Sequence, residues 1–134
     1  MNRHALVALP ERNDARGNLL FGQAPDHIPF AIGRFFALYD PAPGASRGGH
    51  AHRAQHQFLV MLAGAVTVTV DDGQNRTAIR LDRPTLALHV PPMLWLDLDD
   101  FTPGAVCMVL ASDVYAESDY IRDRTEFLKL AETA

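Results

Sequence analysis

The sequence predicts an all-β domain, either a sandwich or a barrel, that ends in a short helix. Several short runs rich in β-branched and aromatic residues follow one another, and clusters of Gly, Pro or Asp separate them. One run alternates strictly, with Val66, Val68 and Val70 interleaved with threonines, which is typical of a strand with one buried face. From Glu117 onward Gly and Pro disappear and apolar residues recur at near-helical spacing, which predicts the helix.

Six runs predict strands, each bounded by turn-forming residues. In chain order they are Phe30 to Tyr39, Gln57 to Leu62, Ala65 to Val70, Arg76 to Leu81, Leu86 to Val90 and Ala105 to Ala111. Asp71, Asp72 and Gly73 tolerate positive φ, so we expect a hairpin between the third and fourth runs. The C-terminal stretch predicts one helix, or a helical turn followed by a helix, with these apolar positions: Tyr120, Ile121, Phe127, Leu128 and Ala131.

The composition fits one compact domain spanning residues 1–134. The chain is 48% hydrophobic, and a domain of this size buries roughly two-thirds of the surface that its unfolded form exposes. Cys107 is the only cysteine, which excludes an internal disulfide and a zinc site made of cysteines alone. The net charge of −4, with scattered arginines, argues against a non-specific nucleic-acid binder.

The sequence also predicts no membrane span. The apolar run from Phe58 to Val70 is interrupted by Gly64 and threonines, and it is shorter than the roughly 20 residues that a spanning helix needs. The first residues lead into mixed polar sequence without the apolar core of a signal peptide. We therefore expect a cytoplasmic protein without a membrane partner.

The densest chemical feature is a pair of histidines after a glycine-rich stretch. On a strand, His50 and His52 project from the same face and form a paired imidazole site. Gly48 and Gly49 let the backbone turn into that strand, and Arg47 brings a fixed positive charge close to the pair. Such a pair has little packing reason to exist, so it is the candidate for chemistry. His4, His27 and His89 are interpreted as exposed or structural residues.

The spacing around this pair resembles the first motif of the cupins, but the usual metal ligands are missing. Gln57 stands where cupins normally have a glutamate, and Leu96 stands where a second cupin motif usually has a histidine. A catalytic divalent metal needs at least three protein ligands. His56 is expected on the face opposite Gln57, and His89 adds a third ligand only if its strand places it inside the barrel. We therefore expect no metal and no cofactor.

The chain as a whole resembles the sugar 3,4-ketoisomerase family of cupins. The resemblance covers nearly the whole sequence. Its motifs are Asp14-Ala15-Arg16-Gly17, Ile28-Pro29-Phe30, Arg47-Gly48-Gly49-His50-Ala51-His52-Arg53, Asp71-Asp72-Gly73, Val109-Leu110-Ala111-Ser112-Asp113 and Asp119-Tyr120-Ile121-Arg122.

This resemblance implies a cupin-type jelly-roll barrel with a short C-terminal helix. It also implies an isomerase that moves the keto group from C4 to C3 of a nucleotide-linked, usually dTDP-linked, 4-keto-6-deoxyhexose through an enediol. His50 and His52 are the expected proton-transfer pair, because an imidazole with a pKa of about 6.5 accepts and donates protons near neutral pH. Tyr39 is expected to stabilise the enediolate oxygen.

The expected substrate-binding residues are mostly cationic. Arginines hold a pyrophosphate by charge-assisted hydrogen bonds, and Trp95 offers either a flat surface for a base or sugar or packing at the barrel mouth. The set is Arg47, Arg16, Arg34, Arg53, Gln57 and Trp95. We interpret Asp119, Tyr120 and Arg122 as structural residues or as part of a subunit contact.

Two departures from the family keep an alternative open. A strand that often carries consecutive tyrosines in relatives reads Phe35-Phe36-Ala37 here, and Leu96 replaces a histidine. The alternative is a non-catalytic cupin that binds a nucleotide-sugar. A metal-dependent, dioxygenase-type cupin is disfavoured by the missing ligands.

The resemblance also implies an assembly. A small barrel exposes edge strands that must be covered, and relatives form dimers that often exchange their N-terminal strands. We therefore expect a homodimer in which the segment from about Leu6 to Phe21 joins the sheet of the partner.

Overall fold

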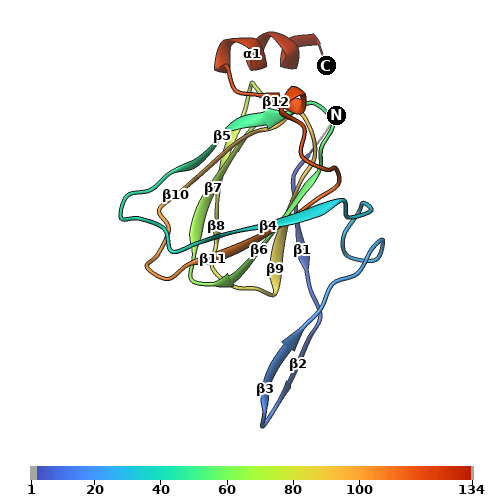
Figure 1. Ribbon diagram of the computed structural model, residues 1–134, viewed down its shortest axis with the longest axis vertical. Coiled ribbons are helices and arrows are strands. Elements are labelled where there is room, and N and C mark those ends of the chain that lie inside the picture. The colour runs from blue at the N-terminus through green and yellow to red at the C-terminus, as the bar shows by residue number, and fades with distance from the viewer. Residues whose placement is uncertain (1–2, 134) are drawn as a thin grey trace.

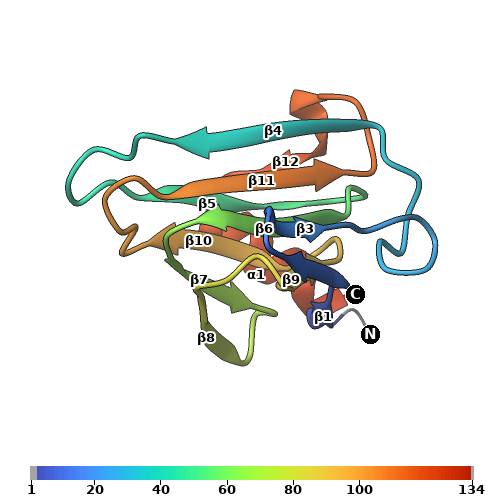
Figure 2. The same ribbon diagram turned by 90° about the horizontal axis from the view of Figure 1, so that it is seen from below.

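The computed structural model describes residues 3–133, and they form two five-stranded antiparallel sheets and a separate hairpin (Figures 1 and 2). The first sheet has the order β1 (Ala5–Ala8), β9 (Leu86–Val90), β6 (Gln57–Ala63), β11 (Val106–Ala111) and β4 (Arg34–Tyr39). The second sheet has the order β12 (Tyr120–Ile121), β5 (Arg47–His52), β10 (Trp95–Asp99), β7 (Val66–Asp71) and β8 (Arg76–Leu81). The hairpin pairs β2 (Glu11–Asp14) with β3 (Gly17–Leu20).

The topology confirms the expected jelly roll of the cupin type. From β4 to β7 the chain alternates between the two sheets, and after the β7–β8 hairpin it alternates again from β9 to β12. Strand neighbours are therefore mostly distant in the sequence, as in a double-sheet jelly roll. After β12 the chain ends in the helix α1 (Arg124–Thr133), which lies at one end of the sandwich (Figure 1).

The main core lies between the two sheets. Val66, Val68 and Val70 of β7 are at most 2% exposed and belong to this core, while Thr67 and Thr69 are only partly buried. The strict alternation of the sequence therefore places the valines inward, as expected. Leu59 of β6 and Leu96 of β10 belong to the same cluster, from opposite sheets.

Two smaller clusters cover the outer faces of the sheets. On the first sheet, Phe58 packs with Leu9 and Ile28 from the N-terminal segment. On the second sheet, Trp95 and Ile121 pack with Phe127 of α1. Phe127 is the buried residue of the helix, and Leu130 and Ala131 add partly buried contacts to the same cluster. Within residues 3–133, no helix is long and apolar enough to cross a membrane.

Most of the expected strands are confirmed. The expected bounds of β8 and β9 match the structure, those of β6 and β11 differ by one residue at one end, and those of β7 differ by one residue at each end. The expectation of a strand from Phe30 is wrong, because β4 begins only at Arg34 and Phe30 packs in the outer cluster of the first sheet. The strands β1, β2, β3 and β10 lack runs of β-branched residues and were not expected as part of this chain's own sheets.

The C-terminal region follows the second of the two expected forms. A 3₁₀ turn at Glu117–Asp119 precedes α1, but between them Tyr120 and Ile121 form β12 rather than helix. They pair with His52 and Ala51 of β5, so sheet pairing overrides the helical spacing.

Gly48 allows β5 to approach β10 closely, just before the histidine pair. It has φ of 90°, and a Cβ atom built there would collide with the backbone oxygen of Leu96 in β10. The pairing of β5 with β10 shifts its register between Leu96 and Asp97, beside this glycine. Only glycine permits both the positive φ and the close approach. The resulting irregularity precedes the histidine pair and lets His50 line the space between the sheets.

Candidate functional site

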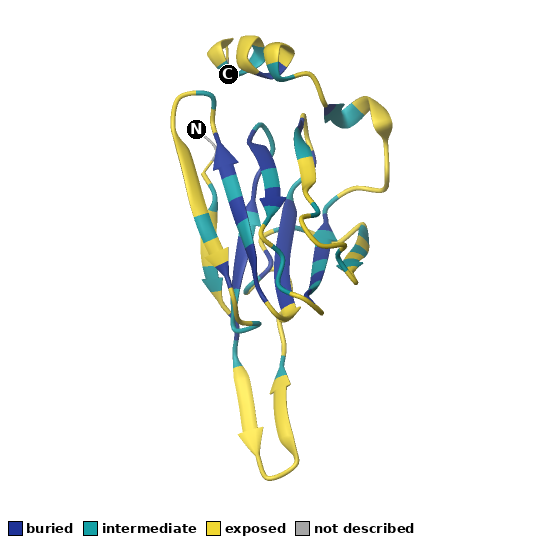
Figure 3. Ribbon diagram, turned by 90° about the vertical axis from the view of Figure 1, so that its left-hand side faces the viewer, coloured by how far each residue is buried: buried dark blue, intermediate teal, exposed yellow. Residues whose placement is uncertain are grey.

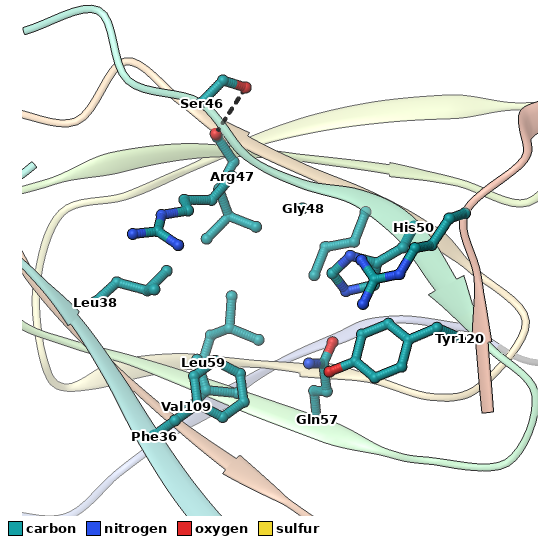
Figure 4. A pocket seen from close by; sticks show the side chains of 13 residues that line it. Phe36, Leu38, Ser46, Arg47, Gly48, His50, Gln57, Leu59, Val109 and Tyr120 are labelled. Carbon is teal, nitrogen blue, oxygen red and sulfur yellow. Dashed lines mark hydrogen bonds between the residues drawn. The ribbon is translucent and has the colours of Figure 1, made fainter. Parts of the chain in front are cut away.

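A cavity of about 330 Å³ opens between the two sheets (Figure 4). Apolar and polar side chains share its walls, and the polar ones gather at both ends. The apolar lining comes from Phe36, Leu38, Leu59, Leu96, Leu98 and Val109, and the polar lining comes from Ser46, Arg47, His50, Gln57, Tyr120 and Arg122. A pocket that combines apolar walls with convergent polar groups is typical of a small-molecule site.

His50 is the histidine of the pair that lines this cavity. Burial, together with the neighbouring His52, lowers the pKa of His50 to about 4. The ring is therefore neutral at physiological pH, and a neutral imidazole is able to accept a proton. The two rings lie edge to face with their centroids 5.0 Å apart.

His52 lies behind His50 rather than in the cavity wall. It is 4% exposed, and its Nδ1 is 3.0 Å from Oδ2 of Asp119. The same carboxylate accepts hydrogen bonds from the backbone N–H groups of Ala54 and Gln55, at 2.8 and 3.3 Å. Burial lowers the pKa of His52, although Asp119 opposes this effect. Asp119 thus holds the neutral His52 as a donor through Nδ1 and fixes the ring that backs His50.

Tyr120 closes the cavity on the β12 side. Its ring packs on His52 and His50, with centroids 4.4 and 5.0 Å apart, and Figure 4 shows its hydroxyl directed toward Gln57. Nη2 of Arg34 donates to that hydroxyl at 3.4 Å. A phenol, an amide and an imidazole therefore converge at one end of the cavity.

The cationic groups of the cavity are two arginines. Within residues 3–133, its lining carries the guanidinium groups of Arg47 and Arg122 and no carboxylate. Arg122 lies over the Tyr120 ring, 4.2 Å from the centroid, and donates two hydrogen bonds to Glu117 at 2.8 and 3.0 Å. Such an arrangement favours an anionic ligand.

Three of the residues expected from the sequence meet in this cavity: His50, Arg47 and Gln57. Arg34 lies next to it, where its guanidinium contacts Tyr120 and Gln55. His52, as described, supports the site from behind.

Two expected substrate-binding residues lie elsewhere, in structural roles. Trp95 is 7% exposed and packs on Phe127, with centroids 5.5 Å apart, so it follows the packing interpretation. Arg53 forms an ion pair with Glu126 of α1 at 2.6 Å and donates to the backbone oxygen of Ser118. Both residues attach the C-terminal region to the second sheet.

Tyr39 and Arg16 also lie outside the cavity of their own chain. Along β4, Phe36 and Leu38 line the cavity, so the alternation of the strand turns Tyr39 to the other face, where it is 69% exposed. Arg16 lies at the turn of the β2–β3 hairpin and is paired with Asp14 at 2.7 Å. Figure 1 shows this hairpin projecting away from the sandwich.

Sequence reasoning did not assign Phe36, Tyr120 and Arg122 to the site. The short strand β12 brings Tyr120 and Arg122 beside β5, and no periodic pattern predicts a strand of two residues. The available signal is the Asp119-Tyr120-Ile121-Arg122 stretch, for which the sequence alone predicts a structural role or a subunit contact. For Phe36, alternation along β4 was the signal.

The remaining histidines do not extend the pair. His56 and His89 lie together, with Nδ1 of His56 3.0 Å from Nε2 of His89, and both rings contact Phe30 of the outer cluster. His56 thus lies on the face opposite Gln57, as expected. Within residues 3–133, no three His, Cys, Asp or Glu side chains are placed so that they could hold a metal ion.

Comparison with known proteins places the chain in a family. Residues 2–132 match the family described as FdtA: WxcM-like, C-terminal. A TDP-4-oxo-6-deoxy-alpha-D-glucose-3,4-oxoisomerase from Aneurinibacillus thermoaerophilus is 42% identical over 116 residues, which are 87% of this chain and 84% of that protein.

Solved structures agree with this match. A 3,4-ketoisomerase from Helicobacter canadensis superposes with a TM-score of 0.94 at 36% identity, over 98% of this chain and 99% of that one. A mutant of the 3,4-ketoisomerase QdtA from Thermoanaerobacterium thermosaccharolyticum, in complex with TDP-4-keto-6-deoxyglucose, has a TM-score of 0.94 at 32% identity, over 97% of this chain and 94% of that one. The family match spans almost the whole sequence and the folds coincide, so the chain belongs to the FdtA family of cupin-fold sugar 3,4-ketoisomerases.

Proposed function

We propose that this protein is an isomerase that moves the keto group of a TDP-linked 4-keto-6-deoxyhexose from C4 to C3. The observation that carries the proposal is a neutral, half-buried His50 at one end of a cavity that also presents two guanidinium groups. The relatives that act on or bind such a substrate supply its class.

In the proposed mechanism, His50 is the base. It removes the C3 proton, which generates an enediolate, and it then returns a proton to C4. The two carbons are adjacent, so one imidazole is able to serve both positions. A positioned general acid–base group typically accelerates a reaction by about 100- to 10,000-fold. His52 and Asp119 hold the ring pair in place from behind.

The nucleotide diphosphate is proposed to bind along the arginines of the cavity. Arg47 stands on β5, three residues before the base, and Arg122 stands beside Tyr120. Charge-assisted hydrogen bonds from these groups to phosphate stabilise the complex by roughly 1.5–3 kcal/mol each. Gln57, which is 5% exposed and lines the cavity, is proposed to orient the sugar.

Isomerisation is expected to need no metal ion. His50 and the other polar groups of the cavity supply proton transfer, and Gln57 stands where cupins usually carry a carboxylate ligand. Protein treated with a chelator and then desalted should convert TDP-4-keto-6-deoxyglucose to the 3-keto product at the rate of untreated protein. Loss of activity that one added metal restores would contradict the role of His50 as the base.

The lowered pKa of His50 predicts an unusual pH dependence. With a pKa of about 4, about 90% of this base is still unprotonated at pH 5, whereas an ordinary histidine is about 3% unprotonated there. The value of kcat/KM at pH 5 should therefore stay within about twofold of its value at pH 7, with circular dichroism verifying the fold at both pH values. A drop of tenfold or more in folded protein would mean that the base titrates as an ordinary histidine.

We further propose a homodimer that exchanges the β2–β3 hairpin. Apart from the half-buried Leu20, the residues of the two strands are exposed, and Figure 3 shows the hairpin projecting beyond the sandwich. An isolated two-stranded hairpin is at best marginally stable in water. The proposed exchange is narrower than the segment expected from the sequence, because Leu6 to Ala8 pair with β9 of their own chain.

The edge of the first sheet is the proposed receiving surface. Strand β4 is the last strand of that sheet, and it exposes Phe35 and Tyr39 at 70% and 69%. The hairpin offers Leu19, which is 58% exposed, and a twofold exchange would cover both surfaces at once. Such an exchange would also take Arg16 to the partner, where it is proposed to contribute to substrate binding.

Sedimentation equilibrium at micromolar concentration should give twice the chain mass of 14.7 kDa. Leu19→Glu is expected to shift this equilibrium toward monomer, because it places a charge in the apolar contact of the hairpin. Leu128→Glu, which changes a partly exposed leucine on α1, is the matched control and should remain dimeric. A wild-type monomer with full activity would contradict the proposed exchange.

A further inference from the structure

The proposed isomerisation moves a second proton that His50 does not account for. The substrate has a hydroxyl at C3 and a carbonyl at C4, and the product has the reverse. The carbon-bound proton therefore leaves C3 and one is delivered to C4, while a hydroxyl proton leaves O3 and one arrives at O4. A group that donates to one oxygen and accepts from its neighbour is needed beside the base.

Tyr120 is the tyrosine that the fold brings to this position. The chain has three tyrosines. Tyr39 is turned to the outer face of β4, and Tyr115 is exposed, with its hydroxyl donating to Glu117. Tyr120 lines the cavity, and its ring centroid is 5.0 Å from that of His50.

The surroundings of the Tyr120 hydroxyl suit proton transfer. The oxygen accepts a hydrogen bond from Nη2 of Arg34 at 3.4 Å, so it retains its own proton for a ligand in the cavity. The same Arg34 group would donate to negative charge that develops on the phenol oxygen during the reaction, while Arg122, paired with Glu117, lies over the ring 4.2 Å from its centroid. The ring itself is fixed by packing on His52.

We infer that Tyr120 is a second catalytic residue of this site and moves the hydroxyl proton from O3 to O4. This inference rests on the proposed function. As His50 takes the C3 proton, the C3–H electron pair forms the C3–C4 double bond, and Tyr120 gives its O–H proton to O4. The resulting phenolate then takes the proton from O3, the C3 carbonyl forms, and C4 receives a proton from His50. The tyrosine and the histidine both end as they began, and no oxidant or reductant is required.

Tyr120→Phe tests the inference, because it keeps the ring and removes only the hydroxyl. With TDP-4-keto-6-deoxyglucose as substrate, kcat should fall by about 100-fold, in the range seen for single donors to a developing oxyanion. KM and the Kd for TDP should each stay within threefold. Tyr115→Phe is the matched control, since it removes an exposed hydroxyl from the ring next to that of Tyr120. The kcat of this variant should stay within twofold of wild type.

The other possible results separate a failure of the proposed function from a failure of the role given to Tyr120. If wild-type protein binds TDP and makes no product, the proposed function fails, whatever Tyr120 does. If wild type is active and Tyr120→Phe keeps kcat within threefold, the proposed function stands and the inference is wrong. If Tyr120→Phe loses TDP binding together with activity, the hydroxyl has a structural role and the inference is also overturned.

Discussion

Replacing His50 with asparagine should lower the rate of 3-keto product formation by at least 100-fold. Asparagine keeps a polar side chain of similar reach but has no nitrogen that titrates, and a positioned general base is usually worth about 100- to 10,000-fold. Binding of TDP should stay within threefold of wild type, because the arginines that line the cavity are unchanged. Single-turnover product analysis and calorimetric TDP titration measure the two quantities.

His27→Asn is the matched control for this substitution. His27 lies in the turn after Gln23, where its Nδ1 accepts a backbone hydrogen bond, and it does not line the cavity. Its removal should leave activity unchanged. A His50→Asn protein that binds TDP and keeps more than a third of wild-type activity would show that the base is another residue.

Of the proposed variants, Phe127→Ala should lower the free energy of unfolding the most. Phe127 is fully buried, and it packs on Trp95 and Ile121 between α1 and the second sheet. Truncating a buried phenylalanine typically lowers the free energy of unfolding by about 3–5 kcal/mol, because transfer energy is lost and a cavity remains. Denaturant unfolding followed by circular dichroism measures the difference.

Leu128→Ala separates burial from helix propensity. Leu128 follows Phe127 in the same helix but is 37% exposed, and alanine is the best helix former. The substitution should therefore lower the free energy of unfolding by less than about 1 kcal/mol. If Phe127→Ala and Leu128→Ala lowered the free energy of unfolding equally, α1 would not be attached to the sandwich through Phe127. Because β12 directly precedes this helix, detachment should also lower activity by loosening Tyr120.

Much of the fold could be predicted from the sequence, because strand signals are local. The alternating valines of β7 and the Asp71-Asp72-Gly73 turn are visible in a short window, and both are confirmed. Strand β10 has alternation as well, with Leu96 and Leu98 buried, but its aspartates and its lack of β-branched residues mask it. Strand β12 exists only because β5 offers an edge for it to pair with, so no local pattern predicts it.

The site was harder to predict than the fold, because it depends on which face of a strand each residue occupies. The pair His50 and His52 was found from its spacing, but only the register shift at Gly48 and the partner Asp119 explain why one ring lines the cavity and the other supports it. The residue type alone favours Tyr39 as the phenol of the site. Alternation along β4 places it outside, and the phenol at the cavity comes instead from Tyr120, 81 positions later in the sequence.

Solvent deuterium tests proton transfer in this cavity most directly. Wild-type protein and TDP-4-keto-6-deoxyglucose should be incubated in deuterated water, and the product examined by NMR and mass spectrometry. The 3-keto product should form and carry deuterium from solvent at C4, because His50 is expected to exchange with water between removing the C3 proton and protonating C4. Tight binding of TDP by wild-type protein, with neither product nor deuterium in the recovered sugar, would contradict proton transfer by His50 and identify the protein as a binder of nucleotide-sugars.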